Sequence, residues 1–416
     1  MTLAEELRAL DPTRRVLVKP LRQKHEFVSE MRDLHREGLS IAELHFIGHS
    51  GMYGIMFGST GWPEQFSPHE WREMLIPFAP NAVAYFHACR TARWFAPFFA
   101  RTFGVTTFGH RLYTTVSTRK DRFAWEARRV GQGDTFPLYI IACVGRKSHG
   151  LPGSLRKYLL GTPAQPMTEC RPARVVGDPS YDAVASLYDK AFEDIRVRRD
   201  EWKWISAHIP TGSRPRVLDI GCGNGALLRA LAERIGASVG VDASSGMIDK
   251  AVANSRSHRN LRFQTIDGPT LPFADGSFDV VTSFLSFRYL DWDPILKEIH
   301  RVLAPRGRFL VVDMVAKPLE PRDALTLVRS AWVHATRPYL DRAFDQNLRT
   351  LTSHPAWKKM LEHNPIRAEH EYRWFLESRF PGQKLETLTV GRTQRLVAFD
   401  AGPKSDSWLL APMSFP

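Results

Sequence analysis

The stretch VLDIGCGNGALL, residues 217–228, decides the fold of the C-terminal part of this 416-residue chain. An apolar run ends near Asp219, three glycines follow at alternate positions (Gly221, Gly223 and Gly225), and an apolar helical pattern begins directly after them. Glycine permits a sharp turn and lets a ligand approach the backbone closely. Taken alone, the pattern fits any nucleotide-binding loop, or a tight packing turn. It predicts a strand, a glycine turn and a helix.

Acidic residues end the two strands that the sequence predicts next. Asp242 closes the run SVGVD, and Asp267 closes the run LRFQTID. A carboxylate at the end of the second strand of such a unit can accept both hydroxyls of a ribose. Asp242 could instead cap the helix that follows it, because aspartate is a common N-cap residue. The residues alone therefore leave both roles open.

The surrounding segment alternates strands and helices, which is typical of a doubly wound, Rossmann-like α/β sheet. A long helix is expected at 181–209, before the first strand. A helical insertion at about 321–380 is expected before a closing hairpin at 385–400. The other expected strands are 216–221, 238–242, 261–267, 278–284 and 308–315, and the other expected helices are 226–236, 244–256 and 293–305.

Four motifs at 180–315 resemble those of class I S-adenosylmethionine-dependent methyltransferases. They are VLDIGCGNG, VGVD, the DG-x-x-LPF-x-DGSFDVV block and EIHRVLAPRGRFLVVD, in this order. Dinucleotide-dependent oxidoreductases are the structural competitor, but their usual fingerprint is G-x-G-x-x-G, and here the third glycine comes one residue early. The resemblance implies a methyltransferase with S-adenosyl-L-methionine as its cofactor.

The resemblance also implies where the methionine end of that cofactor is held. Asp219 and the loop of Gly221, Gly223 and Gly225 would hold it, and Ser283 would line the same end.

The remaining cofactor contacts are implied in the same way. Asp242 would take the ribose hydroxyls, and Met247 would pack on the adenine. Asp267 would accept a hydrogen bond from the adenine amino group, with the Gly268 amide nearby. Each of these residues could otherwise be a cap or turn residue.

Methyl transfer from a sulfonium is an in-line displacement, so the protein mainly positions the reactants and excludes water. A general base is needed only if the acceptor must lose a proton. Where the family often has histidine, this chain has Arg288 and Tyr289, which are the tentative substrate contacts. Arg288 could bind an anionic group of the substrate or form a salt bridge. The acceptor itself, a small molecule or a peptide, stays open.

An aromatic stretch at 318–380 is where such enzymes usually build the acceptor pocket. Rings at helical spacing are more often core than pocket, so the stretch is indicated only as a region. Its polar and aromatic residues are Trp332, His334, Tyr339, His370, Tyr372 and Trp374.

The N-terminal part alternates strands and helices as well. This predicts a three-layer α/β sandwich with a mainly parallel sheet. The expected strands are 15–21, 41–48, 82–89 and 105–110, and the expected helices are 25–38, 67–78 and 93–104.

Two reactive residues end strands of this N-terminal part. His49 follows the run IAELHFIG, and Cys89 ends the run AVAYFHAC. A thiol at one strand end with a histidine at the next is the arrangement of a cysteine nucleophile. Residues 14–120 resemble the caspase-like fold of cysteine peptidases, which includes caspases, metacaspases, separase and CHAT proteases. The family usually has glycine directly after the histidine, whereas Ser50 intervenes here, so a degenerate module that binds without cleaving is the alternative.

Three other interpretations of the same residues remain. The run FIGHSGMYG resembles the nucleophile elbow of α/β-hydrolases with Ser50 on the turn, but Met52 stands where that motif needs glycine. His49, His87 and Cys89 could form a metal site, although we predict none. Cys89 could also be a small buried residue, because free cysteine is among the most buried types.

Composition indicates the compartment, the partners and the domain boundaries of the protein. Four cysteines are too few for a disulfide scaffold, and the first residues lack the basic and apolar blocks of an export signal, so we expect a cytoplasmic protein. The net charge of +13 is compatible with RNA as a partner, but no basic–aromatic ribbon stands out. A Pro- and Gly-rich segment divides the chain into a caspase-like domain at 1–146, a linker at 147–179 and a methyltransferase domain at 180–416.

We therefore expect a methyltransferase fused to a peptidase or binding module. The alternatives are a bifunctional enzyme in which proteolysis is the main activity, and an RNA methyltransferase.

Overall fold

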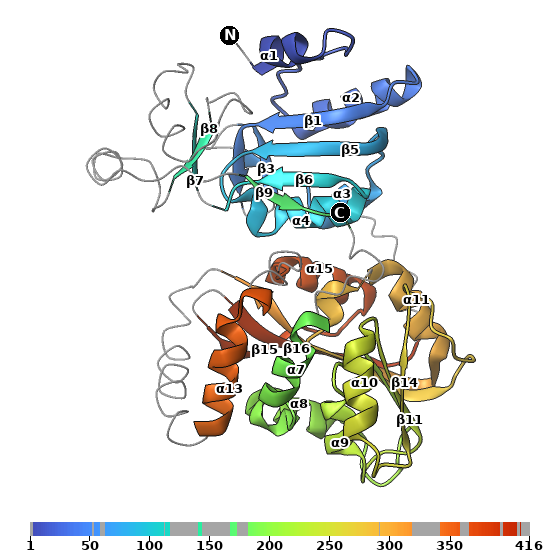
Figure 1. Cartoon of the computed structure of the whole chain (residues 1–416). Helices are drawn as coiled ribbons and strands as arrows, with labels where there is room; N and C mark the ends of the chain where they lie inside the picture. The colour runs from blue at the N-terminus through green and yellow to red at the C-terminus, as the bar shows by residue number, and fades with distance from the viewer. Residues whose placement is uncertain are drawn as a thin grey trace. The chain divides into compact units, whose positions relative to one another are not determined.

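The computed structural model of the chain forms two compact units, Met1–Ala173 and Arg174–Pro416 (Figure 1). The structure describes residues 3–51, 54–58, 63–111, 113–116, 140–143, 167–172, 182–290, 292–317, 342–357, 366–391, 394–405 and 408. In these residues, no helix is both long and apolar enough to cross a membrane.

The C-terminal unit is built on one sheet whose strand order is β12-β11-β10-β13-β14-β16-β15. Strands β12 to β14 of this row are parallel, and β16 pairs antiparallel with both β14 and β15. The predicted Rossmann-like sheet is therefore confirmed. The strands are β10 (Val217–Ile220), β11 (Ser238–Asp242), β12 (Leu261–Thr265), β13 (Phe278–Phe284), β14 (Leu303–Ala316), β15 (Glu386–Val390) and β16 (Gln394–Pro403).

The strand order reverses at β10, and this reversal positions the site. From β10 the chain first adds strands on one side and then on the other, so the loops leaving β10 and β13 diverge. In open α/β sheets, ligands bind at this switch point, outside the carboxyl ends of the strands.

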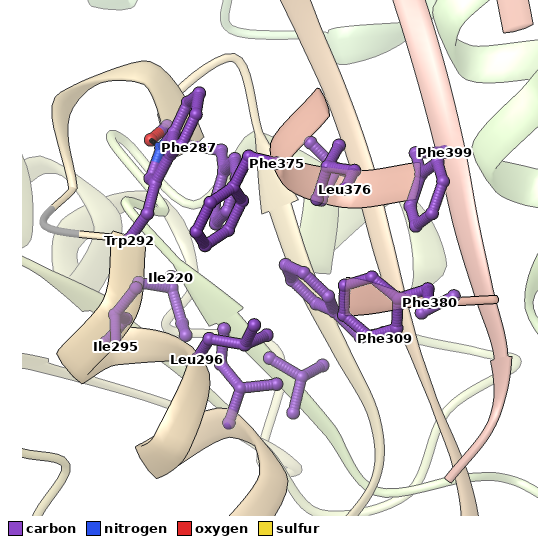
Figure 2. Packing of buried hydrophobic residues seen from close by; sticks show 14 of the residues in the cluster. Ile220, Phe287, Trp292, Ile295, Leu296, Phe309, Phe375, Leu376, Phe380 and Phe399 are labelled. Carbon is purple, nitrogen blue, oxygen red and sulfur yellow. Dashed lines mark hydrogen bonds between the residues drawn. The ribbon is translucent and has the colours of Figure 1, made fainter. Parts of the chain in front are cut away.

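Two hydrophobic clusters hold helices against this sheet. Figure 2 shows part of one, in which Trp292 stacks on Phe287 with ring centroids 5.2 Å apart, and Phe375 lies 4.7 Å from Trp292. The other cluster joins Trp204 and Leu228 to the sheet. The helices are α8 (Arg199–His208), α9 (Ala226–Leu231), α10 (Ser245–Asn254), α11 (Trp292–Val302), α13 (Arg342–Ser353) and α15 (Glu369–Arg379), with a short 3-10 turn η5 (Phe287–Tyr289).

The single helix expected at 181–209 is wrong. The segment is broken into η3 (Asp182–Val184), α7 (Ala185–Ala191), η4 (Ile195–Val197) and α8. The backbone carbonyls at the break accept hydrogen bonds from side chains of another helix and its loop: Phe192 O from Asn224, and Glu193 O from Arg229. Asp194 then caps the new turn by accepting from the amide of Arg196. Tertiary contacts thus replace the helical bonds that the periodicity predicted.

The N-terminal unit is built on a sheet of order β1-β5-β6-β9. Strands β1 (Ile41–Ile47), β5 (Phe78–His87) and β6 (Thr106–Gly109) are parallel, and β9 (Thr168–Cys170) is antiparallel to β6. Its other elements are α1 (Leu3–Leu10), α2 (Lys24–Arg36), α3 (Pro68–Glu73), α4 (Phe95–Phe103), β2 (His49–Gly51), β3 (Gly54–Gly58), β4 (Pro63–Glu64), η1 (Thr91–Arg93), β7 (Tyr113–Val116) and β8 (Ile140–Cys143).

Helices α2, α3 and α4 share one aromatic cluster with this sheet. Trp71 and Phe99 are fully buried, and Phe86 of β5 lies 4.9 Å from the ring of Phe99. Because side chains alternate along a strand, His45 and His87 stand on the opposite face. One helical layer of the predicted sandwich is therefore described, and the third layer stays a prediction.

Two sequence expectations for this unit need correction. Residues 15–21 form no strand; Leu17 and Val18 are exposed, so their apolar side chains give the segment no core to join. The segment 147–179, expected to be a linker, contributes the strand β9 to the sheet. Three residues are too few for alternation to reveal a strand. The rest of that segment lies largely outside the described residues.

Candidate functional site

The glycine loop follows β10 and depends on backbone angles that only glycine adopts readily. Gly221, Gly223 and Gly225 have φ values of +75°, +54° and +75°. A Cβ atom on Gly225 would lie 2.8 Å from the ring of Phe263, and one on Gly221 would collide with Ser286. The loop is therefore folded tightly against its neighbours, as a cradle for backbone contact with a ligand requires.

Asp242, at the end of β11, holds this loop in place. One carboxylate oxygen accepts from the amide of Gly223 at 2.9 Å, and the other accepts from the amide of Ser244 at 2.9 Å. The N-cap of α10 is Ser244, whose hydroxyl accepts from Met247 N at 3.1 Å. The helix-cap role left open for Asp242 therefore belongs to Ser244, and Asp242 joins the ends of β10 and β11.

Asp219 lies beneath the loop and is almost fully buried. Its carboxylate accepts from the Thr282 hydroxyl at 2.8 Å. Burial raises the pKa of Asp219 from 3.8 to about 7, the Thr282 hydrogen bond opposes this, and the charge of Asp242 adds to it. A carboxyl group close to half-protonation therefore underlies the loop at neutral pH.

The turn after β13 faces the same loop. The hydroxyls of Ser283 and Ser286 both donate to the carbonyl of Ile220, at 3.1 and 2.8 Å. Between them Leu285 has a φ of +60°, a left-handed conformation that costs a bulky residue about 1–2 kcal/mol. Strain of this kind collects where a turn must hold one exact shape.

The remaining predicted cofactor residues lie on the elements that follow β11 and β12. Met247 is buried on α10. Asp267 and Gly268 are exposed after β12, and the position of a Cβ on Gly268 has no neighbour within 4 Å. Because β10, β11 and β12 are parallel neighbours, their carboxyl ends bring these residues to one edge of the sheet.

Arg288 forms the salt bridge that was one of the two roles left open for it by the sequence. Its amide donates to Asp313 at 2.8 Å and its guanidinium pairs with the same carboxylate, which also accepts from the hydroxyl of Tyr372. Asp313 is fully buried, so it already balances the charge of Arg288. The salt bridge is therefore present, and a contact between Arg288 and a substrate stays a prediction.

Of the six aromatic and histidine residues expected near the acceptor, three lie in the part of the chain that the structure describes. Tyr372 is fully buried and belongs to the main core cluster. The ring centroids of His370 and Trp374 lie 5.6 Å apart. Trp332, His334 and Tyr339 lie outside the described residues.

Sequence reasoning missed several residues that contact the loop. Thr282 lies in β13, where it contacts Asp219, and Ser286 lies in the turn after that strand. Tyr188 and Asp189 come from α7. Asn224, inside the glycine motif itself, was the one available signal.

In the N-terminal unit the parallel pairing of β1 and β5 brings the loops of His49 and Cys89 to one edge. The Ser50 hydroxyl donates to the Cys89 carbonyl. The thiol accepts from Thr114 N at 3.3 Å and lies 3.3 Å from the Thr114 hydroxyl. Within the described residues, the hydrogen bonds of this thiol run to Thr114 rather than to His49.

The metal-site interpretation of this edge depends on the contacts of its histidines. His87 shares a hydrogen bond of 3.0 Å with His45, and burial, with His45 and His110 adding to it, lowers the pKa of His87 to about 3. Across the part of the chain that the structure describes, no three His, Cys, Asp or Glu side chains gather as a metal site would require.

Known proteins resemble the chain as follows. A family model described as a methyltransferase domain matches residues 218–311. Demethylmenaquinone methyltransferase of Thermus thermophilus is 37% identical over 168 residues, which cover 39% of this chain and 72% of that protein. The uncharacterized methyltransferase YcgJ of Bacillus subtilis is 32% identical over 164 residues, covering 39% and 60%. Chloroplastic tocopherol O-methyltransferase of Arabidopsis thaliana is 34% identical over 186 residues, covering 42% and 50%.

The matched residues 218–311 contain the glycine loop, Asp242 and the turn after β13. They coincide with the switch point of the sheet, where a ligand is expected from the fold. Through its C-terminal unit the chain belongs to the class I S-adenosylmethionine-dependent methyltransferases, and S-adenosylmethionine is its cofactor.

Proposed function

We propose that the C-terminal unit transfers the methyl group of S-adenosylmethionine to a small planar acceptor of the hydroquinone or phenol class. The observation that carries the proposal is the position of Asp242, which links the glycine loop to the end of β11. The acceptor class is supported by two relatives, which are named for demethylmenaquinone and tocopherol.

The site residues fit this cofactor. The crowding around Gly221 and Gly225 leaves the backbone of the loop, rather than side chains, to contact the methionine end. Asp242 would take the ribose hydroxyls, with Met247 and Asp267 on the adenine side. Asp219 and Ser283 support the loop from below.

The reaction asks mainly for position. When bound, the cofactor supplies an electrophilic methyl group on a sulfonium. The acceptor's nucleophilic atom forms the new bond as the sulfur–carbon bond breaks, the sulfur leaves as a neutral thioether, and the acceptor's proton passes to water. A guanidinium has no free acceptor atom, so Arg288, which pairs with Asp313, is not assigned as the group that removes this proton. The chain's own contribution is to hold both reactants in line and exclude water.

Calorimetry with S-adenosylmethionine tests the cofactor part. We expect the wild-type chain to bind it and Asp242→Ala to raise Kd by about tenfold or more, because a charged hydrogen-bonding group is lost. Asp249→Ala, an exposed aspartate on α10, is the matched control. Equal affinity of Asp242→Ala and wild type would contradict the assignment.

Transfer of a labelled methyl group tests the acceptor. Prenylated 1,4-naphthoquinol, tocopherol and total RNA are offered separately to the whole chain. We expect incorporation into one of the first two. Incorporation into RNA alone, lost steeply between low and physiological salt, would support the RNA methyltransferase alternative instead.

For the N-terminal unit we infer a caspase-like module with a thiol nucleophile, active or degenerate. The parallel neighbours β1 and β5 support it, because they carry His49 and Cys89 beyond adjacent carboxyl ends. Arg90, directly after the cysteine, has a φ of +58°, which is the sharp turn expected beside an exposed nucleophile. The backbone amide of Thr114 donates to the sulfur at 3.3 Å, so the thiol lies beside a hydrogen-bond donor.

An electrophilic thiol probe separates the two forms of this module. In an active peptidase His49→Ala abolishes rapid labelling of Cys89 and any peptide cleavage. In a degenerate module labelling is slow and unchanged by His49→Ala. Thr114→Val removes the hydroxyl but keeps the amide, and serves as the control for local packing.

A further inference from the structure

The short helix α7 lies on the glycine loop, although it comes from the segment before the first strand. A Cβ atom placed on Gly223 would lie 3.8 Å from Cε1 of Tyr188, so the tyrosine ring covers the middle of the loop. The next residue, Asp189, accepts from the side-chain amides of Asn224 at 2.9 Å and Asn254 at 2.8 Å. One carboxylate oxygen thus ties α7 both to the loop and to α10.

A second carboxylate fixes the start of the same segment. Asp182 accepts from the hydroxyl of Ser244 and, at 3.2 Å, from the amide of Gly246. Ser244 also donates its amide to Asp242. The segment is therefore attached to the loops after both β10 and β11, which are the two loops that hold the cofactor in the proposed function.

The outer side of α7 is covered by α13 and the residues that follow it. Tyr188 lies 4.8 Å from the ring of Phe192 and stacks on Trp357 at 6.4 Å, and Leu351 is fully buried in the same small cluster. The side-chain amide of Asn347 donates to the backbone carbonyl of Lys190 at 3.1 Å. The two helices thus have a core of their own, separate from the clusters on the sheet.

The phenol of Tyr188 is placed among polar residues of the site. Burial raises the pKa of Tyr188, Arg198 and Arg288 oppose this, and Tyr289 and Asp242 add to it. The guanidinium of Arg288 in turn lies 4.5 Å from the ring of Tyr289. The phenol of Tyr188 therefore interacts electrostatically with Asp242, at the end of β11, and with Arg288 and Tyr289, in the turn η5.

We propose that α7 forms the roof of the methyl-transfer site, with Tyr188 as a residue that contacts the bound reactants and Asp189 as the positioning residue that holds the roof on the loop. The inference rests on the proposed function. Tyr188 and Tyr289 present flat faces and phenol groups, which suit a planar, hydroxylated acceptor ring. Asp189 acts through Asn224, whose side chain also donates to the carbonyl of Phe192 and accepts from Ala226 N.

The roof explains why the helix at 181–209 is broken. If the helix ran on through Phe192, that carbonyl would be used inside the helix and would not be available to Asn224. The break turns α7 across the loop instead of letting it continue into α8. The cost of the interrupted helix is offset by a buried hydrogen bond from Asn224 and an exposed one from Arg229.

Calorimetry on the whole chain with S-adenosylmethionine tests the positioning role. Asp189→Ala is expected to raise Kd about tenfold, because the side-chain amides of the buried Asn224 and the half-buried Asn254 lose a charged acceptor. Asp189→Asn keeps the shape of the side chain but loses its charge, so its Kd is expected to lie between those of the wild type and Asp189→Ala. Asp249→Ala, on the exposed side of α10, is the control and should bind as wild type does. The melting temperature without cofactor is recorded for each variant, so that a loss of folding is recognised.

Kinetics with prenylated 1,4-naphthoquinol as the probe acceptor test Tyr188. Tyr188→Phe keeps the ring, so we expect the Kd of the cofactor to stay within about twofold and KM for the acceptor to rise several-fold, since only one neutral hydrogen bond is lost. Tyr188→Ala removes the roof surface and should lower kcat as well. A merely structural tyrosine would lower the melting temperature of Tyr188→Ala without changing KM or kcat of the folded fraction.

Two results would overturn the inference in distinguishable ways. If wild type binds S-adenosylmethionine but Asp189→Ala and Tyr188→Ala bind and react as wild type does, the roof is not part of the site and the proposed function still stands. If wild type itself binds no S-adenosylmethionine, the proposed function fails and the inference fails with it.

Discussion

At the scale of single residues, four aspartates of the candidate site differ in what their carboxylates contact. Asp242 joins two loops through backbone amides, whereas Asp219 is buried beneath them with one hydroxyl partner. Asp189 and Asp182 fasten a helix from elsewhere in the chain. The sequence identified the first two because they end strands in a known motif. It missed the other two because nothing in a helical pattern shows which side faces a loop.

Asp219 gives a prediction about pH. Its pKa of about 7 in the fold exceeds the 3.8 of an exposed aspartate, so the folded state holds its proton more tightly than the unfolded state does. Stability from this group is therefore full at low pH and is lost as pH rises from 3.8 to about 7. We expect the melting temperature of Asp219→Asn, relative to wild type, to rise between pH 5 and pH 8 in scans without cofactor. A difference that is the same at both pH values would contradict the raised pKa of Asp219.

At the scale of elements, the glycine loop shows why the spacing of glycines in the sequence could predict a tight turn. The loop needs positive φ at three alternate positions, and this requirement is visible in the sequence as three glycines. The break after α7 was not visible, because its cause is a hydrogen bond from Asn224 to Phe192, which is distant in sequence. The strand β9 was missed because it is only three residues long.

Gly225→Ala tests the loop as an element. The alanine must adopt a φ of +75° and bring its Cβ to 2.8 Å from Phe263, so we expect a loss of about 2–5 kcal/mol from backbone strain and overpacking together. Gly212→Ala is the matched control, because its φ is +84° but the Cβ has open space, and about 1–2 kcal/mol is expected. Denaturant unfolding measures both. Equal losses would mean that crowding by Phe263 contributes nothing.

At the scale of the whole molecule, each unit has a sheet of mainly parallel strands whose carboxyl ends carry its candidate residues. The three cysteines whose side chains the structure describes differ sharply in burial. Burial raises the pKa of Cys170 to about 11 and the pKa of Cys222 well above its ordinary value, whereas Cys89 is only partly buried. The least buried thiol of these three therefore belongs to the N-terminal unit, whereas Cys222 belongs to the unit of the glycine loop.

Alkylation of the whole chain tests this ranking. With iodoacetamide near pH 8, we expect Cys89 to be modified before Cys170 and Cys222, because a buried neutral thiol is a poor nucleophile. Peptide mass spectrometry follows each site, and denatured protein provides the reference in which all thiols react alike. Faster modification of Cys222 than of Cys89 would contradict the burial described for the glycine loop.

The sequence by itself determined the Rossmann-like unit, its cofactor and the approximate place of the site. It could do so because turns that need glycine and strands that end in acids are local requirements, written in neighbouring residues. Only the tertiary structure decided that Asp313 neutralises Arg288, that Ser244 rather than Asp242 caps α10, and that Tyr188 covers Gly223. These depend on side chains far apart in sequence meeting in the fold, where burial and charge pairing, rather than periodicity, choose the partners.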